Sequence, residues 1–572
     1  MDPTDAKRIR NDADNVQRYD RQLRLWQKDG QSALEAARVV VLGSSTLASE
    51  SLKNLVLPGI GEFVVVDDAL VDEADARTNF FVRAADVGQP RAERTVEHLA
   101  ELNPDVRGRA VVQAPASVLE GEGAALLEGA TLVIACAQPE PVVRALSERC
   151  WAAGIPLLAA AATGFLAELR MSACEHTVVE SHANGRPDLR VMAPFEALRA
   201  HADAVCLDAL NTADLAHVPQ VVLLIKAVDA WAAEAGAEKR ALTFAQKKAV
   251  AAVVQRMAPG PDEENFAEAA AAVVASCGDY AVPAEVAHIL ADPAAAAPGA
   301  QVTAVAAATV PTPGAQGAAL RPAAIRGDPA SAFWLLAAAL RRYMASEHAA
   351  GMLPHSGTIP DMKADTASFV ALQRIYKQKA DQDKAELVGQ LHAVLHDAGL
   401  PANHVPAAQI DTFCKNAGRL RLLRTTPLHA DPSAPPAGLD AMASQGVLAH
   451  YALFRAADRF VAKHGRHAGM PPSAPSAQPA DLDALVESDA RELASIAREL
   501  LAGPWAVEGV DVPEALAAEL ARGGGHELHN VAALAGGIVA QEAIKLITHQ
   551  YVPQDNICII DTANSRLVAT TA

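Results

Sequence analysis

The feature that most constrains this chain is a single β-α-β unit near its beginning. Residues 37–66 contain a short apolar run, RVVVLG, then a turn of small residues, a helical stretch and a second apolar run, EFVVVDD. Short β-branched runs of this kind are typical of parallel strands that are buried on both faces. Pro58-Gly59 ends the helix before the second strand. The pattern restricts the chain to folds built from parallel strands and crossover helices.

Two more strand candidates extend this pattern. ATLVIAC ends at Cys136, and IPLLAA follows a helical stretch over 142–153. Strands that alternate with helices predict a parallel sheet covered by helices on both faces. We therefore expect the first 172 residues to be a doubly wound α/β domain.

The middle of the chain has helical periodicity instead. It extends from about 194 to 524, and within 365–395 the apolar residues recur near the 3.6-residue period. The stretches 292–322 and 468–480 are rich in Ala and Pro and are interpreted as loops or linkers. A helix over 531–548 and a last strand, NICIID, restore α/β character. The predicted fold class is α/β, with an α/β domain at 1–172 and 525–572 and a mainly helical insertion at 173–524.

Composition excludes several classes of function. The net charge of −19 over 572 residues argues against nucleic-acid binding, which depends on Lys and Arg neutralising phosphates. No apolar stretch is convincing as a leader or a membrane span. Seven scattered cysteines without C-x-x-C spacing fit neither a disulfide framework nor a zinc ribbon. We expect an intracellular protein, cytoplasmic and/or nuclear, with no nucleic-acid or membrane partner.

The turn after the first strand lacks most of the glycines of a nucleotide site. Such turns use glycines so that backbone N–H groups and a helix N-terminus can approach phosphate. Here the turn is GSSTLAS at 43–49, where only Gly43 remains and each later residue carries a Cβ. Asp67, at the end of the second strand, fits a ribose ligand or a solvated strand end, and the sequence leaves both open. The turn is compatible with a Rossmann-like fold but not with tight phosphate binding.

Five segments resemble the ubiquitin-like-activating enzymes, which adenylate the C-terminal carboxylate of a modifier. RYDRQLRLW at 18–26 and LKNLVLPGIGEFVVVDD at 52–68 resemble the opening of that family. TIPDM at 358–362, LFRAADRF at 453–460 and AALAGGIVAQEAIKLITHQYVP at 532–553 resemble one branch, the regulatory subunits of the heterodimeric enzymes for the Nedd/Rub modifier. The resemblance implies a Rossmann-like adenylation domain of ThiF/MoeB type. It also implies that the insertion is similar to a catalytic-cysteine domain without the cysteine nucleophile.

Compared with active members of this family, the adenylation machinery is eroded. Adenylation needs Mg²⁺ and cationic side chains to absorb the charge that develops on pyrophosphate. The departures are the GSSTLAS turn, Ala69 in place of a second acid after Asp67-Asp68, Asn79-Phe80-Phe81-Val82-Arg83 in place of N-L-N-R-Q, Arg91 in place of a lysine, and Ala135-Cys136-Ala137-Gln138-Pro139 where a metal-binding Asp is expected. We therefore expect no cofactor and no metal to be bound by this chain alone, with ATP and Mg²⁺ in a partner subunit.

No residue is assigned as catalytic. A thiolate nucleophile needs a cationic or dipolar setting, and no cysteine here lies in the P-x-C-T type setting of the family. Cys174 has His176 nearby, but residues two apart on a strand share a face by default, so a structural cysteine is the better interpretation. His526-x-x-His529 lacks a third zinc ligand, and capping or a surface role fits it better. Gly536-Gly537 is interpreted as a site of close packing rather than phosphate binding.

Arg21 is the one residue to which the resemblance gives a role. It is the second arginine of R-Y-D-R-Q, which in related dimers reaches from one adenylation domain into the ATP site of the other. The alternative is a structural salt bridge on an N-terminal helix. Arg18 and Arg24 are interpreted as ordinary solvated charges.

The resemblance implies an assisting function. The chain would pair with a catalytic subunit that adenylates the C-terminal glycine of the Nedd/Rub modifier, forms a thioester, and passes the modifier to a conjugating enzyme and then to cullins. Two alternatives stay open: a self-sufficient adenylating enzyme of the same family, and a NAD(P)-binding Rossmann oxidoreductase. Both alternatives predict that the chain alone binds a nucleotide, whereas the assisting function predicts that it does not.

Overall fold

The computed structural model describes most of the chain as two compact units. One unit comprises residues 1–176 and 423–572, and the other comprises residues 177–422. The Ala/Pro-rich segments expected to be loops lie outside the described residues, except 292–296 and 468–472. The described residues are 18–182, 188–239, 242–260, 262–278, 280–296, 329–430, 435–436, 438–472 and 481–570.

The first unit is built on one eight-stranded sheet. Its strand order is β10-β9-β6-β5-β4-β1-β2-β3. The five strands from β5 to β3 are parallel, and β6, β9 and β10 are antiparallel to their neighbours. The α/β fold class and the opening β-α-β unit are confirmed. The strands are β1 (Arg38–Leu42), β2 (Glu62–Val66), β3 (Arg107–Val111), β4 (Leu132–Cys136), β5 (Leu157–Thr163), β6 (Leu166–Ser172), β9 (Ile557–Asp561) and β10 (Arg566–Thr570).

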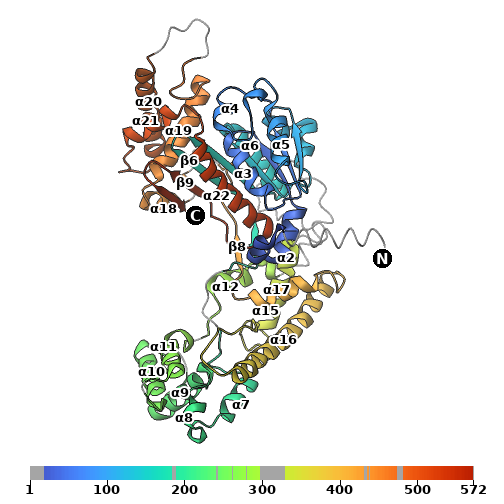
Figure 1. The fold of residues 1–572 in the computed structure, drawn as a ribbon, viewed down its shortest axis with the longest axis vertical. Helices are drawn as coiled ribbons and strands as arrows, with labels where there is room; N and C mark the ends of the chain where they lie inside the picture. Colours follow the sequence, from blue (N-terminus) through green and yellow to red (C-terminus); the bar gives the residue numbers. More distant parts are fainter. Residues whose placement is uncertain are drawn as a thin grey trace. The chain divides into compact units, whose positions relative to one another are not determined.

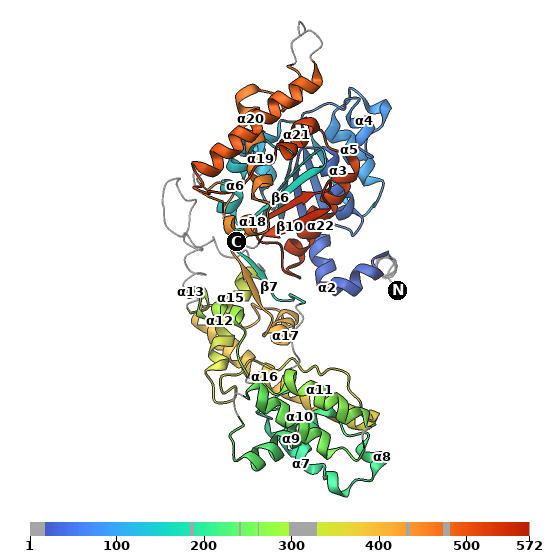
Figure 2. The same ribbon diagram turned by 90° about the vertical axis from the view of Figure 1, so that its left-hand side faces the viewer.

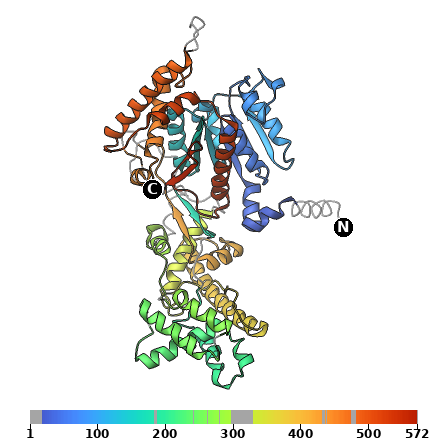
Figure 3. The same cartoon turned by 60° about the vertical axis from the view of Figure 1, so that its left-hand side comes forward.

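Helices cover both faces of this sheet. On one face α3 (Thr46–Val56) lies beside α22 (His529–Thr548), as Figures 1 and 3 show, and α22 also contacts β4, β5 and β6. On the other face α6 (Glu140–Ala153) packs on β1, β2 and β4. By length and composition α22 is apolar enough to cross a membrane, but it is a core helix with much of its surface buried. The remaining helices of this part are α2 (Asp20–Ala36), α4 (Asp75–Thr78) and α5 (Arg91–Ala100).

The second boundary of the insertion differs from the expected one. Helices α18 (Leu439–Ser444), α19 (Leu448–His464), α20 (Leu482–Ala502) and α21 (Glu514–Gly523) were expected in the insertion, which was predicted to end at 524. Their apolar side chains instead pack on Leu166 of β6 and on Ile557 and Ile559 of β9, so the first unit resumes at residue 423 (Figure 2). Helical periodicity identifies an apolar face but not the core that the face covers.

The second unit, residues 177–422, contains two hydrophobic cores joined by one long helix. Helix α16 (Thr366–Asp397) contributes Leu372 and Tyr376 to the first core, and Leu387 and Leu391 to the second. The first core includes α7 (Glu196–Ala204), α9 (Gln220–Ala235), α10 (Phe244–Met257) and α11 (Glu264–Ser276). The second includes α12 (Ala284–Ala291), α13 (Pro293–Ala296), α15 (Pro329–Met344) and α17 (Ala407–Asn416). The short α8 (Thr212–Leu215) also lies in this unit, and β7 (His176–Val178) pairs with β8 (Arg421–Leu423) where the chain passes between units.

The two adjacent glycines of α22 have different environments. A Cβ on Gly536 would lie 2.8 Å from Glu50 Cβ and 2.9 Å from the Ser51 backbone nitrogen, whereas a Cβ on Gly537 would meet nothing within 4 Å. Gly536 therefore lets α22 approach α3 closely, which confirms the packing interpretation for that residue. The partner in this contact is a helix rather than the sheet.

This difference gives a matched pair of substitutions. Gly536→Ala is expected to lower the stability of the first unit by about 1–3 kcal/mol, because backbone atoms of α3 must move to admit the methyl group. Gly537→Ala is expected to raise stability by up to about 1 kcal/mol through helix propensity alone. Thermal unfolding measured by calorimetry distinguishes the two. Equal shifts for both variants would contradict this packing.

Candidate functional site

The candidate nucleotide site lies where β1, β2 and β4 end. Gly43 follows β1 with φ of +87°, and an added Cβ would lie 2.8 Å from both the Cys136 carbonyl oxygen and Gln138 Nε2. Gln138 Nε2 also donates a hydrogen bond of 2.9 Å to that carbonyl. The glycine is thus required by the neighbouring chain after β4 as well as by its backbone conformation. Its retention needs no phosphate.

Asp67 is an internal ligand of the turn. Its Oδ2 accepts hydrogen bonds from the backbone N–H of Ser44 at 2.9 Å and from the Ser44 hydroxyl, and its Oδ1 accepts from the Ala69 N–H at 3.0 Å. The side chain is 5% exposed, so Asp67 is not a solvated strand end. Its bonds to Ser44 and Ala69 give Asp67 a structural role in the turn that needs no ribose.

Arg91 neutralises Asp67 from the first turn of α5. Its Nη2 lies 2.9 Å from Asp67 Oδ2, and its Nη1 lies 3.0 Å from Asp75 Oδ1. Burial alone would raise the pKa of Asp67, but the charge of Arg91 and the hydrogen bonds from Ser44 and Ala69 lower it below its ordinary value. The planar guanidinium of Arg91 binds both carboxylates in a fixed geometry. The ammonium group of a lysine would bind them in a less defined geometry. In this structure the position expected for a family lysine serves an internal ion pair.

A second carboxylate occupies the N-terminus of α3. Glu527 Oε2 accepts a hydrogen bond of 2.7 Å from the backbone N–H of Leu47, and the Ser45 hydroxyl caps the Ala48 N–H at 3.4 Å. Burial raises the pKa of Glu527. A helix N-terminus attracts anions because its first N–H groups lack helical partners. Here the chain's own side chains already bind those groups.

The role of Glu527 was not predicted from the sequence. It lies 480 residues away from its partner Leu47, in a segment with no pattern of its own. Only knowledge that the end of the chain returns to the first β-α-β unit would have identified it.

The other eroded positions are structural or exposed. Val82 is buried, Asn79 donates a hydrogen bond of 3.0 Å to the Ser49 hydroxyl, and Phe80 is 76% exposed. Arg83 lies mostly in solvent. None of these residues places a positively charged group beside the GSSTLAS turn.

The RYDRQLRLW segment places Arg21 on the surface. Tyr19 and Trp26 are buried, and the Tyr19 hydroxyl accepts a hydrogen bond of 2.9 Å from Asn103. Arg18 pairs with Asp105 at 2.7 Å, and Arg24 pairs with Asp20 at 3.0 Å.

Arg21 itself is exposed and forms no ion pair or hydrogen bond with any residue that the structure describes. The aromatic anchors therefore fix the helix, and Arg21 remains available.

The cysteines are poor nucleophiles where they are buried. Burial raises the pKa of Cys150, Cys277, Cys414 and Cys558 to about 12, and that of Cys136 still higher. Cys174 is half-buried.

His176 and His529, which the sequence analysis noted, lie beside other side chains of the fold. His176 is buried and stacks on His549 with ring centroids 4.5 Å apart. His529 Nε2 lies 3.3 Å from Glu50 Oε1. Over the described ranges, no group of three or more His, Cys, Asp or Glu side chains could hold a metal.

Removal of the Asp67 carboxylate should destabilise the first unit. Asp67→Ala leaves Arg91 and the turn without their shared acceptor, and a loss of about 3 kcal/mol is expected. Because the pKa of Asp67 is lowered in the fold, this stabilisation is present above the ordinary value of 3.8 and is lost as the pH falls through the folded value. Calorimetry from pH 7 to pH 3, with the exposed Asp68→Ala as control, measures it. A Tm equal to that of the control at pH 7 would refute the role of Asp67.

Removal of the Glu527 charge should stabilise the first unit at high pH. The pKa of Glu527 is raised in the fold, so its favourable contribution is full below the ordinary value of 4.5 and is lost as the pH rises through the folded value. Glu527→Gln keeps an acceptor for Leu47 without the charge, and it is expected to gain about 1 kcal/mol or less at pH 8 and nothing at pH 4. The exposed Glu508→Gln serves as control. A lower Tm at pH 8 would show that the carboxylate charge itself stabilises α3.

The chain is similar along nearly its whole length to known proteins. The model of the ThiF family matches residues 19–569. The NEDD8-activating enzyme E1 regulatory subunit of Xenopus laevis is 33% identical over 555 residues, which cover 95% of this chain and 96% of the relative. The corresponding subunit of Drosophila melanogaster is 32% identical, with 97% of each chain covered.

A plant relative and a solved structure extend the comparison. The NEDD8-activating enzyme E1 regulatory subunit AXL of Arabidopsis thaliana is 31% identical over 94% of this chain and 95% of its own length. A crystal structure of the E. coli tRNA N6-threonylcarbamoyladenosine dehydratase TcdA with AMP is 23% identical, with a TM-score of 0.24, and covers 26% of this chain and 61% of that chain. The chain belongs to the ThiF family and, within it, to the NEDD8-activating enzyme E1 regulatory subunits.

Proposed function

We propose that this chain is an inactive adenylation subunit that acts only beside a catalytic partner. The partner binds Mg²⁺-ATP, adenylates the C-terminal glycine of a NEDD8-type modifier and forms the thioester. The modifier then passes to a conjugating enzyme and to cullins. The complex acts in the cytoplasm, the nucleus or both.

Two internal carboxylates carry this proposal: Asp67 binds the turn after β1 and Glu527 binds the N-terminus of α3. A phosphate would have to displace two carboxylates that are bonded to the same backbone N–H groups it needs, and their negative charges would repel it. The cation bonded to this turn, Arg91, is already paired with Asp67 and Asp75. The chain alone is therefore expected to bind neither ATP nor NAD(P), which argues against the two alternative functions.

The exposed guanidinium of Arg21 supports the proposal that this residue contributes to the ATP site of the partner. A guanidinium without an internal partner loses no ion pair when it meets a triphosphate, and its fork geometry suits phosphate oxygens. Arg24, three residues along the same helix, is held by Asp20. Arg21 thus has both the exposure and the chemistry to act in trans, as the family resemblance implies.

The test is ATP–pyrophosphate exchange with the modifier, using this chain alone, a catalytic subunit alone, and the mixture. Exchange is expected only in the mixture. Arg21→Ala is expected to reduce exchange by about tenfold or more through loss of a charge-assisted contact, whereas Arg24→Ala leaves it near the wild-type rate. Subunit association is measured in parallel by analytical ultracentrifugation.

Two outcomes would overturn the proposal. Exchange by this chain alone would mean that the GSSTLAS turn binds ATP despite Asp67 and Glu527. Equal rates for the Arg21→Ala and Arg24→Ala mixtures, at equal association, would remove Arg21 from the mechanism without affecting the inactivity of this chain.

A further inference from the structure

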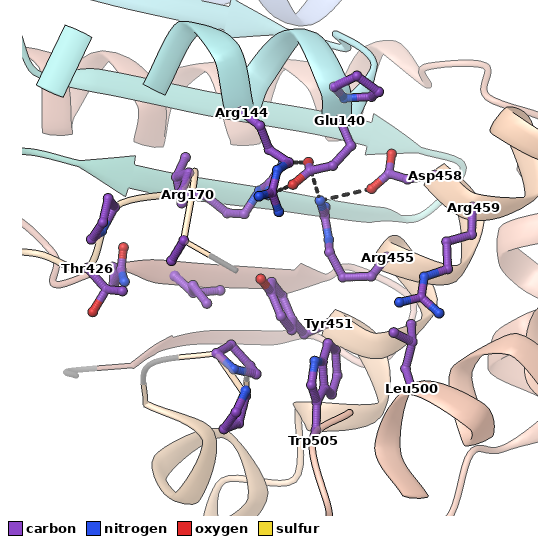
Figure 4. Close-up of a pocket in the computed structure, with 18 of the residues that line it drawn as sticks. Glu140, Arg144, Arg170, Thr426, Tyr451, Arg455, Asp458, Arg459, Leu500 and Trp505 are labelled. Carbon is purple, nitrogen blue, oxygen red and sulfur yellow. Dashed lines mark hydrogen bonds and ion pairs between the residues drawn. The ribbon is translucent and has the colours of Figure 1, made fainter. Parts of the chain in front are cut away.

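A separate cavity of about 310 Å³ lies in the first unit. It is bounded by α6, β6, α19 and the segment after β8, and none of its lining residues belongs to the Gly43 turn or its ligands. Figure 4 shows arginine and carboxylate side chains on one side of it, with Tyr451 and Trp505 on another. A volume of this size is at the lower end of small-molecule sites.

The charged wall is a buried network built around Arg455. Its Nη1 lies 2.6 Å from Glu140 and 2.8 Å from Asp458, and its Nη2 pairs with Glu168. Arg170, only 6% exposed, pairs with Glu140 at 2.7 Å. Burial raises the pKa of Asp458 to about 6. Networks of this kind are costly to desolvate and add little net stability, so stability alone is a weak reason for one.

Several atoms of this network lack hydrogen bonds. Arg170 Nε and Arg455 Nε are buried and have no hydrogen-bond partner among the described residues, whereas Asp458 Oδ2 is held by its ion pair with Arg455. Both arginines line the cavity. Buried polar groups without hydrogen bonds are uncommon in native proteins and indicate a missing ligand or water.

Two further arginines at the cavity have no carboxylate partner. Arg144 Nη2 donates a hydrogen bond of 3.1 Å to the His429 carbonyl oxygen. Within the part of the chain that the structure describes, neither Arg144 nor Arg459 forms an ion pair. The cavity therefore contains more guanidinium groups than carboxylates, and two of those groups, Arg144 and Arg459, form no ion pair with the described residues.

An apolar wall adjoins this network, and the Arg455 guanidinium lies over the Tyr451 ring, 5.4 Å from its centroid. The rings of Tyr451 and Trp505 stack with centroids 5.7 Å apart, and Leu500 and Ile557 lie beside them. Tyr451, Arg455 and Arg459 are four residues apart along α19, so one helix face presents both the aromatic and the cationic surface. Arg455, Asp458 and Arg459 come from the LFRAADRF segment, to which the adenylation chemistry assigns no role.

We propose that this cavity binds a small organic anion, a carboxylate or phosphate carried on an apolar body. Arg144 and Arg459 bind the anionic group, and the Tyr451–Trp505 wall contacts the body. This site is independent of the proposed role in adenylation, and binding to it requires neither ATP nor the partner.

The test is isothermal titration calorimetry on the full chain. The probes are phenyl phosphate and 3-phenylpropionate, which differ in the anionic group, with inorganic phosphate and benzyl alcohol as anion-only and body-only probes. One or both phenyl anions are expected to bind more tightly than either partial probe. The double variant Arg144→Gln/Arg459→Gln is expected to weaken binding by about tenfold or more. Neither substitution breaks an ion pair, and circular dichroism verifies the fold.

Arg491→Gln is the matched control, because Arg491 is 73% exposed on α20 and does not line the cavity. Full affinity in the control and reduced affinity in the double variant would support the site. Equal affinity in all three proteins, or inorganic phosphate binding as tightly as the phenyl anions, would overturn it. A peptide that contains Glu and Phe is titrated as a further probe. Binding of this peptide without binding of either phenyl anion would also overturn the proposal, and would assign the cavity to a protein partner.

Discussion

Two carboxylates bind the segment that leads from β1 into α3, Asp67 at Ser44 and Glu527 at Leu47, and much of the first unit depends on these interactions. Asp67 joins the end of β2 to the turn after β1 and, through Arg91, to α5 and α4. Glu527 joins the same turn to the start of α22. In a nucleotide-binding domain this point would be left open for phosphate. Here it is a junction between elements, and the bonds that occupy the turn are the same ones that hold those elements together.

The same bonds explain how the fold is held together without a bound nucleotide. Gly43 is still required by the chain after β4, and Gly536 by the contact with α3. Both constraints concern packing and backbone conformation rather than substrate. Tyr19 and Trp26 likewise hold the first helix in place whether or not its domain turns over ATP. Arg21 is exposed on that helix and, among the described residues, has no ion-pair partner.

The sequence predicted four of the five parallel strands, because runs such as VVVL, FVVV and LVIAC are continuously apolar. It did not predict β3, β6 or β10. β3 and β10 are short and partly exposed, and β6 carries the buried charges Glu168 and Arg170, so none shows a continuous apolar run. The eroded site was recognised from missing glycines and acids. Its replacement by Glu527 could not be, since no local pattern links residues 480 positions apart. The extent of the insertion was overestimated for the related reason that α18 to α21 have ordinary amphipathic patterns.

The position of β9 has a consequence for biosynthesis. This strand, at residues 557–561, pairs with β6 on one side and β10 on the other, so the sheet is incomplete until β9 has been synthesised. Until then one edge of β6 is unpaired. The helical second unit lies wholly within 177–422, so all of its residues are synthesised before β9. Nascent chains that lack β9 thus expose an open strand edge, which favours association with other chains and makes protection by chaperones useful.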